Sequence, residues 1–173
     1  MAHILLIAEN WPPRIGGIER YLEHLARELS KKHSITVIAP KTVIKPIESR
    51  ALPATVIVIR KRFFWPLVRP KWLPLFVYMY WYVRRKHVDV VLCGKALFEG
   101  LAGYYLQKYF HIPYIVCTYA MEIETWRKRA ITARKLSRSL QSADKVLYIN
   151  NQTRQTLLNI NVKEKQLLAV YPG

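Results

Sequence analysis

The sequence predicts an α/β fold of the Rossmann-like, doubly wound class, in which helices cover both faces of a parallel sheet. Three observations support this prediction. Short runs of aliphatic and β-branched residues alternate along the chain with segments of helical periodicity, as βαβ units require. The apolar runs lack polar alternation, which is typical of strands that are covered on both faces. The length of 173 residues suits a single domain.

The predicted elements follow one another as strand, helix and strand. The first strand, residues 3–8 (HILLIA), is followed by a Pro/Gly loop at 10–17 and by an amphipathic helix that starts at residue 18 and ends near Lys31 and Lys32. Further strands are expected at residues 35–39, 54–59, 88–93, 113–118, 145–149 and 167–171, and further helices at 96–110, 126–142 and 152–158. Right-handed crossovers between these strands give the doubly wound arrangement.

Four loops of this fold are expected to share one cleft, because ligands of doubly wound sheets bind beyond the carboxyl ends of the strands. The loops are residues 9–17, 94–95, 119–124 and 150–151. Lys95 is equally well explained as a contact for an anionic substrate and as a solvated loop lysine. Glu122 and Glu124 are, with Glu9, the acids expected in this cleft.

A glycine pair joins the first strand to the first helix, in the stretch Arg14-Ile15-Gly16-Gly17-Ile18-Glu19. Two glycines permit positive φ angles and the close approach of a ligand. The free N–H groups and the macrodipole of the helix start favour a phosphate, and Arg14 adds a cation. A tight turn that needs glycine only for steric reasons is the equal alternative. The G-x-G-x-x-G fingerprint is absent here, which disfavours NAD or FAD.

The charge balance indicates an anionic partner. Lys and Arg number 28 against 11 Asp and Glu, a formal net charge of +17, so nucleic acid, a phosphorylated substrate or a membrane surface is expected to bind. Cys93 and Cys117 lie in apolar runs and are interpreted as buried, reduced thiols of a cytosolic protein. The histidines lack ligand spacing, so we expect no metal site, and no nucleophile elbow is present. The start of the chain does not resemble a targeting signal, and no window is long and apolar enough to span a bilayer.

Basic and aromatic residues are interleaved in two acid-free stretches, between Ser49 and Val88 and between Trp126 and Arg138. Rings at headgroup depth and cations facing anionic lipid are typical of a membrane interface. The expected contacts with a membrane or a lipid acceptor are Arg62, Phe63, Phe64, Trp65, Trp72, Arg127, Lys128 and Arg129. The alternative is a buried helix with a solvated basic face, because Leu75, Tyr78, Met79 and Tyr82 recur at helical spacing. Nucleic acid is disfavoured, since no known binding motif occurs.

Several motifs, in order along the chain, resemble those of one enzyme family. They are Trp11-Pro12-Pro13-Arg14-Ile15-Gly16-Gly17-Ile18-Glu19-Arg20-Tyr21-Leu22, Val88-Asp89-Val90-Val91, Pro113 to Glu122, Ala143-Asp144-Lys145-Val146 and Val170-Tyr171-Pro172-Gly173. This set is similar to the N-terminal domain of retaining GT-B glycosyltransferases of family 4, especially the phosphatidylinositol mannosyltransferase-like branch. The chain differs from the family at Tyr119-Ala120, where His-Gly is common.

The resemblance implies an acceptor-side domain over residues 1–173 and a second, nucleotide-sugar-binding domain that this chain lacks. It implies that Gly16 and Gly17 lie under the donor diphosphate and beside the acceptor, and it marks Tyr119 and Glu122 as catalytic candidates. The expected reaction is the transfer of a sugar from a nucleotide sugar to a lipid-linked or membrane-associated acceptor, with retention. The domain is expected to bind no cofactor, to be inactive alone, and to lie at the cytoplasmic face of the cell membrane. A basic, non-enzymatic α/β module that binds nucleic acid or a protein is the alternative.

Overall fold

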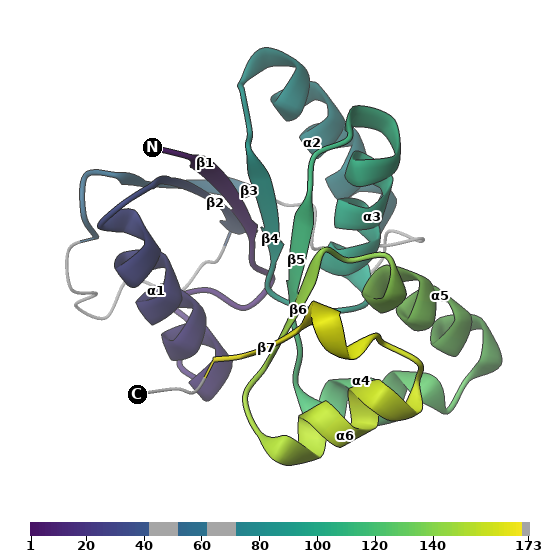
Figure 1. The fold of residues 1–173 in the computed structure, drawn as a ribbon. Helices are drawn as coiled ribbons and strands as arrows, with labels where there is room; N and C mark the ends of the chain where they lie inside the picture. The colour runs from purple at the N-terminus through teal and green to yellow at the C-terminus, as the bar shows by residue number, and fades with distance from the viewer. Residues whose placement is uncertain (42–51, 62–71, 171–173) are drawn as a thin grey trace.

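A single parallel sheet organises the protein in the computed structural model, which describes residues 1–41, 52–61 and 72–170 (Figure 1). Seven strands lie in the order β3-β2-β1-β4-β5-β6-β7, and every neighbouring pair is parallel. The strands are β1 (His3–Ile7), β2 (Ser34–Pro40), β3 (Val56–Lys61), β4 (Val90–Cys93), β5 (Tyr114–Cys117), β6 (Lys145–Tyr148) and β7 (Leu167–Ala169). The predicted Rossmann-like fold is therefore confirmed.

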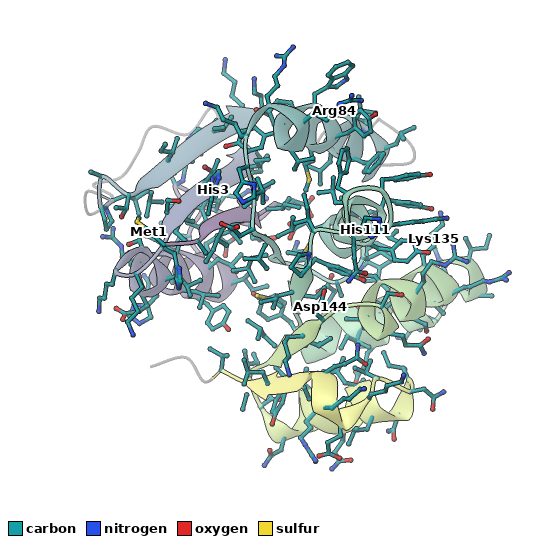
Figure 2. All side chains as sticks on the ribbon, turned by 45° about the horizontal axis from the view of Figure 1, so that its top comes forward. Met1, His3, Arg84, His111, Lys135 and Asp144 are labelled. Atoms are coloured by element: carbon teal, nitrogen blue, oxygen red, sulfur yellow. The ribbon has the colours of Figure 1, made fainter. Side chains whose placement is uncertain are left out.

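Helices cover both faces of this sheet. They are α1 (Gly17–Ser30), α2 (Trp72–Arg85), α3 (Phe98–Phe110), α4 (Ala120–Arg127), α5 (Ala130–Gln141) and α6 (Asn151–Asn159), with a short 3₁₀ helix η1 (Glu164–Gln166) before β7. Figure 1 shows α1 on one side of the sheet and α2, α3 and α5 side by side on the other, with α4 and α6 below. Arg84 of α2 and Lys135 of α5 point outward from their helices (Figure 2).

The strands β1, β2, β4, β5 and β6 contribute alternate side chains to two apolar layers, because successive residues of a strand point to opposite faces. In β1, Leu5 and Ile7 belong to the core under α2, α3 and α5. Ile4 and Leu6 belong to the core under α1. The sequence of β1 is therefore an almost continuous apolar run, as expected for a strand with two covered faces.

Two acidic residues of the family motifs hold the amino-terminal edge of the sheet. Asp89 Oδ2 accepts a hydrogen bond from the N–H of His3 at 2.7 Å, which ties the entry of β4 to β1. Asp144 Oδ2 accepts one from the N–H of Tyr114 at 2.9 Å and another from Gln107 at 2.8 Å. These carboxylates join neighbouring strands and lie away from the expected cleft.

The prediction of a single basic helix at residues 126–142 is wrong. The structure breaks it into α4 and α5 at Lys128 and Arg129. The Thr132 hydroxyl donates to the carbonyl of Trp126 at 2.6 Å, a carbonyl that a backbone N–H would reach in a continuous helix, and it also lies 2.9 Å from the carbonyl of Arg129. Among the described helices, none is long and apolar enough to cross a bilayer.

Candidate functional site

A cleft of about 650 Å³ lies at the carboxyl-terminal edge of the sheet, beyond β1, β4, β5 and β6. All four loops predicted to meet there contribute to this edge, and the cleft borders the point where the strand order reverses between β1 and β4. Its walls are formed by Glu9, Ile18, Lys95, Phe98, Tyr119, Met121, Glu122, Thr125, Trp126, Ile149, Asn150 and Gln152.

Lys95 and two carboxyl groups form the charged part of the cleft. Lys95 Nζ lies 3.3 Å from Glu9 Oε2, and both side chains are about three-quarters buried. Glu122, from the first turn of α4, accepts a hydrogen bond at Oε1 from the N–H of Ala96 at 3.1 Å. The loops after β1 and β4 and helix α4 are thereby linked through side chains at the mouth of the cleft.

Burial raises the pKa of Glu122 from its ordinary value of 4.5 to about 7. Desolvation of the carboxylate is the main cause, while Lys95 and the backbone N–H groups of Leu97 and Ala96 act in the opposite direction. Glu122 therefore changes charge near neutral pH, and it is able to accept or donate a hydrogen bond there.

Glu99 is a buried carboxyl group of this region that sequence reasoning missed. It lies in the first turn of α3, is 1% exposed, and accepts the N–H of Glu9 at Oε1 at 2.6 Å. Desolvation raises its pKa well above the ordinary range, and the nearby Glu9 and Glu122 add to that rise. The only available signal was an isolated acid in an otherwise apolar helix start. The predicted Glu124 is exposed and does not line the cleft.

Unpartnered polar atoms gather around this edge. Five buried side-chain oxygens of the described residues have no hydrogen-bond partner: Asn10 Oδ1, Tyr21 Oη, Glu99 Oε2, Tyr119 Oη and Glu122 Oε2. All five belong to the segments that follow β1, β4 and β5. Buried polar atoms normally find partners, so such a concentration at one place is typical of a site that binds a polar ligand.

Tyr119 and Tyr21 bring two of these hydroxyl groups together. Their rings meet edge to face, with centroids 6.3 Å apart, and Tyr119 is 8% exposed. Burial raises the pKa of both hydroxyls, so they stay protonated and act as hydrogen-bond donors or acceptors. The structure thus places the predicted Tyr119 in the cleft wall.

The glycine pair starts α1 at the rim of the cleft, next to Ile18. Neither glycine uses the positive φ that glycine permits: Gly16 is extended, with φ of −178°, and Gly17 is already helical. A Cβ on Gly17 would meet no atom within 4 Å, so its backbone is open to a ligand. A Cβ on Gly16 would lie 2.2 Å from Oε2 of Glu19, a buried carboxylate that accepts a hydrogen bond from Asn10 at 2.6 Å.

The remaining wall of the cleft is apolar. Phe98, at the start of α3, meets Trp126 of α4 edge to face, with centroids 5.5 Å apart. Met121 is 82% exposed beside them. The cleft therefore offers charged and hydroxyl groups at one side and rings at the other, an arrangement that suits an amphipathic ligand.

Other predicted site residues lie outside this cleft. Arg14 is exposed in the preceding loop and is not a wall residue. Lys128 and Arg129 are exposed between α4 and α5, Arg127 ends α4, and Trp72 begins α2. Arg62, Phe63, Phe64 and Trp65 lie outside the described residues. The described part of the chain brings no metal-ligand cluster together, and both cysteines are free and buried.

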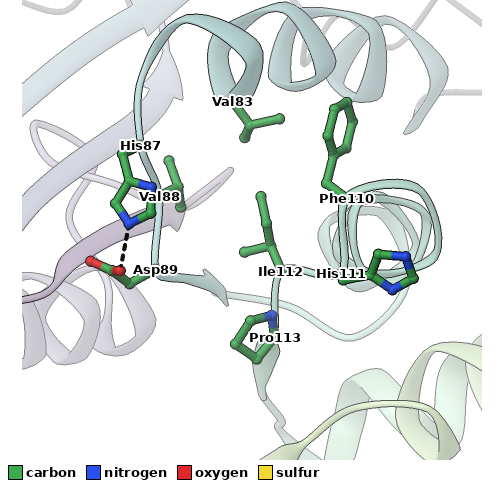
Figure 3. Close-up of a pocket in the computed structure, with 8 residues that line it drawn as sticks. All are labelled: Val83, His87, Val88, Asp89, Phe110, His111, Ile112 and Pro113. Atoms are coloured by element: carbon green, nitrogen blue, oxygen red, sulfur yellow. Dashed lines mark hydrogen bonds and ion pairs between the residues drawn. The ribbon is translucent and has the colours of Figure 1, made fainter.

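A second hollow, of about 370 Å³, lies at the opposite edge, before β4 and β5 (Figure 3). His87 Nε2 lies 2.8 Å from Asp89 Oδ1 at its rim, and the His87 side chain is 86% exposed. The N–H of His3, and then His87, lower the pKa of Asp89. This edge holds the amino ends of the strands, where ligands of doubly wound sheets do not bind, so the carboxyl-edge cleft is the candidate site.

A parallel sheet with such a cleft at its switch point defines a Rossmann-type ligand-binding domain. The chain belongs to glycosyltransferase family 4, whose sequence profile matches residues 15–173. The resemblance to the N-terminal domain of GT-B glycosyltransferases is thereby confirmed.

Individual relatives agree with this assignment. The chain is 50% identical over 38 residues to the GDP-mannose-dependent alpha-(1-6)-phosphatidylinositol monomannoside mannosyltransferase of Mycolicibacterium smegmatis, a match that covers 22% of this chain and 10% of that protein. Sucrose-phosphate synthase from Thermosynechococcus elongatus has a similar fold, with a TM-score of 0.80 at 16% identity. Anabaena HepE in complex with UDP-glucose is similar with a TM-score of 0.69 at 12% identity. Both matches cover all of this chain, but only 48% and 44% of the solved chains.

Proposed function

We propose that residues 1–173 form the acceptor-side half of a glycosyltransferase that moves a sugar from a nucleotide-sugar donor to a lipid-linked or membrane-associated acceptor, with retention at the anomeric carbon. The family supplies the reaction class. The mannosyltransferase of M. smegmatis is named for a GDP-mannose donor and a phosphatidylinositol mannoside acceptor, and HepE was solved with UDP-glucose. Both names agree with a nucleotide-sugar donor, and the first agrees with a lipid acceptor.

The observation that carries the proposal is the set of five unpartnered buried oxygens in the segments that follow β1, β4 and β5, two of which belong to the cleft-lining residues Tyr119 and Glu122. A sugar or inositol ring presents several hydroxyl groups, which pair with carboxyl and phenol oxygens. Glu122 and Tyr119 are positioned to orient such hydroxyls from the cleft wall. Phe98 and Trp126 offer rings for the apolar part of an acceptor.

The anionic group of the substrate is assigned to the opposite side of the cleft. The open backbone of Gly17 presents N–H groups at the start of α1, where the helix dipole favours negative charge. Lys95 supplies a cation held by its ion pair with Glu9, and Arg14 is an exposed cation in the loop after β1. Glu9 and Glu122 then limit how much negative charge the cleft accepts, which favours one phosphate group or diphosphate over a polyanion.

The proposal includes three further expectations. A second domain, in this polypeptide or in a partner, completes the donor site, so residues 1–173 alone do not transfer sugar. The domain uses no bound cofactor. The enzyme works at the cytoplasmic face of the cell membrane as a peripheral protein, because its acceptor is there.

A ligand panel tests this function against the alternative of a basic module that binds nucleic acid, which the net charge of +17 favours. Residues 1–173 are titrated by calorimetry with inositol 1-phosphate, GDP-mannose, UDP-glucose and a single-stranded oligonucleotide. Saturable binding of the inositol phosphate or of a nucleotide sugar, weakened by Lys95→Ala, is expected. Tight binding of the oligonucleotide with no response to the small ligands would reverse the assignment.

A further inference from the structure

The outer surface of the α2, α3 and α5 layer has an unusual composition. These three helices contain one acidic residue, Glu99, and it is buried. Their exposed cations are Arg84, Arg85, Lys108, Arg134, Lys135 and Arg138. Within the described residues none of these six has a carboxylate partner. We call this surface, with the apolar residues described next, the basic aromatic face.

Apolar side chains lie exposed on the same face. Leu73, Val77 and Trp81 are spaced four residues apart on α2, so they form one stripe, and they are 42%, 47% and 54% exposed. Tyr109 of α3 is 58% exposed, and Ile131 at the start of α5 is 74% exposed. These exposed side chains do not contribute to the core of the domain, and exposed apolar patches mark interaction sites.

Ring contacts join the three helices into one surface. Phe76 of α2 meets Tyr105 and Tyr109 of α3, with centroids 5.7 and 6.0 Å apart. The guanidinium of Arg138 of α5 lies 6.0 Å from the ring centre of Tyr104 on α3. Figure 1 shows the three helices as one layer on a single side of the sheet.

The cations of this face lie beside its exposed rings. The guanidinium of Arg85 is 6.0 Å from the ring centre of Trp81, and Lys108 Nζ is 6.0 Å from that of Tyr109. Arg84 donates a hydrogen bond to the Tyr80 hydroxyl at 2.8 Å. Rings with cations at their edge match the headgroup region of a bilayer, where the ring enters the acyl boundary and the cation meets an anionic headgroup.

We propose that the basic aromatic face docks on an anionic lipid bilayer. The aliphatic members Leu73, Val77 and Ile131 fit acyl chains but have no face on which a nucleic acid base stacks. A second copy of the chain is disfavoured, because pairing two such faces would bring unpaired cations together. Docking here builds on the proposed function: Phe98, which lines the cleft, begins α3, so the cleft borders the membrane-facing layer.

The proposed face differs from the contact set expected from the sequence. In the stretch after Trp126, the expected contacts were Arg127, Lys128 and Arg129, whereas the proposed face uses the cations of α5. The proposed face also includes residues of α3, for which the sequence predicted no membrane contact. Trp81 replaces the aromatic run at residues 63–65 as the described anchor.

Vesicle sedimentation tests the docking with the chain as it exists. Residues 1–173 are mixed with phosphatidylcholine vesicles with and without phosphatidylglycerol. The expected result is binding to the anionic vesicles, which Arg84→Gln/Arg85→Gln weakens by about 25-fold, since each cation contributes roughly fivefold. The matched control is Arg20→Gln/Lys32→Gln, which removes two exposed cations, one from α1 and one from the turn after it, on the other side of the sheet. Equal loss in both double variants would overturn the assignment of this face.

Insertion of Trp81 provides a second readout. Brominated phosphatidylglycerol is expected to quench tryptophan fluorescence in the wild-type protein and to quench it much less in Trp81→Phe. Thermal unfolding of each variant checks that it is folded. Unchanged quenching in Trp81→Phe would contradict docking on lipid. So would a dimer in solution that Trp81→Ala dissociates, because it would make a second copy of the chain the partner of this face. Oligonucleotide binding that is lost in Arg84→Gln/Arg85→Gln and in Trp81→Phe would likewise contradict it. Calorimetry with inositol 1-phosphate distinguishes this failure from failure of the proposed function, because the arginine variants leave the cleft intact.

Discussion

Gly17→Ala separates the two interpretations of the glycine pair. Gly17 is the first residue of α1, its φ is not positive, and an added Cβ meets no atom within 4 Å. Nothing in the fold therefore requires glycine at this position. Alanine reduces the freedom of the unfolded chain, which stabilises a protein by roughly 0.4–1 kcal/mol at a compatible site. For a domain of this size that is a rise in Tm of about 1–4 °C.

The same methyl group is expected to weaken ligand binding. It covers the open backbone at the start of α1, next to the cleft-lining Ile18, and a lost hydrogen bond to a charged group costs about 1.5–3 kcal/mol. The affinity for GDP-mannose or inositol 1-phosphate should fall by roughly 10- to 100-fold. Scanning calorimetry measures the Tm and titration calorimetry the affinity. A variant that is more stable but binds more weakly supports a backbone site for the anion.

Gly16→Ala is the matched contrast. Its Cβ would lie 2.2 Å from the Glu19 carboxylate, which must move and give up its hydrogen bond to Asn10. We expect a loss of about 1–2 kcal/mol of stability. If Gly17→Ala binds both ligands as tightly as the wild type does, the proposed anion site at the backbone of Gly17 is refuted. If it destabilises the fold, the open geometry at Gly17 is refuted.

Three further predictions concern charged groups. Because the folded state holds the proton of Glu122 up to pH about 7 while the unfolded chain releases it near 4.5, stability should fall as the pH rises from 5 to 8. Glu122→Gln should reduce this fall in Tm, although the raised pKa of Glu99 should preserve part of it. An unchanged dependence of Tm on pH in Glu122→Gln would contradict the burial of Glu122. Lys95→Ala should weaken GDP-mannose binding by roughly tenfold at constant Tm, because it removes the cation of the cleft; undiminished affinity would exclude Lys95 from the site. Asp144→Ala removes the acceptor of the Tyr114 N–H and should cost about 1–3 kcal/mol in urea unfolding without changing ligand affinity; a stable variant with impaired binding would place Asp144 in the site.

The fold was predictable because its signal is repeated along the chain. Most strands are short apolar runs, and they alternate with helices that carry one apolar side, so the connection rules lead to the Rossmann class. The cleft was predictable for the same reason, since the topology places the carboxyl ends of the strands together. Lys95, Tyr119 and Glu122 were found in this way, from their position after a strand.

Features that depend on single side-chain contacts were not predictable. The break before α5 is accompanied by a hydrogen bond from the Thr132 hydroxyl to the Trp126 carbonyl, and nothing in the composition of residues 126–142 indicates that contact. Glu99 resembles any first-turn acid of a helix, and its burial follows from how α3 meets the loop after β1. The roles of the two glycines also depend on their surroundings and not on positive φ angles: Gly17 faces open space, while a side chain at Gly16 would meet Glu19.

The central claim is that the cleft beyond β1, β4 and β5 holds the substrate. The most direct measurement maps amide chemical-shift changes in residues 1–173 while inositol 1-phosphate, and separately GDP-mannose, is added. The largest changes are expected at Gly17, Lys95, Glu122 and Asn150. Changes centred on His87 at the other edge of the sheet, or none at saturating ligand, would contradict it.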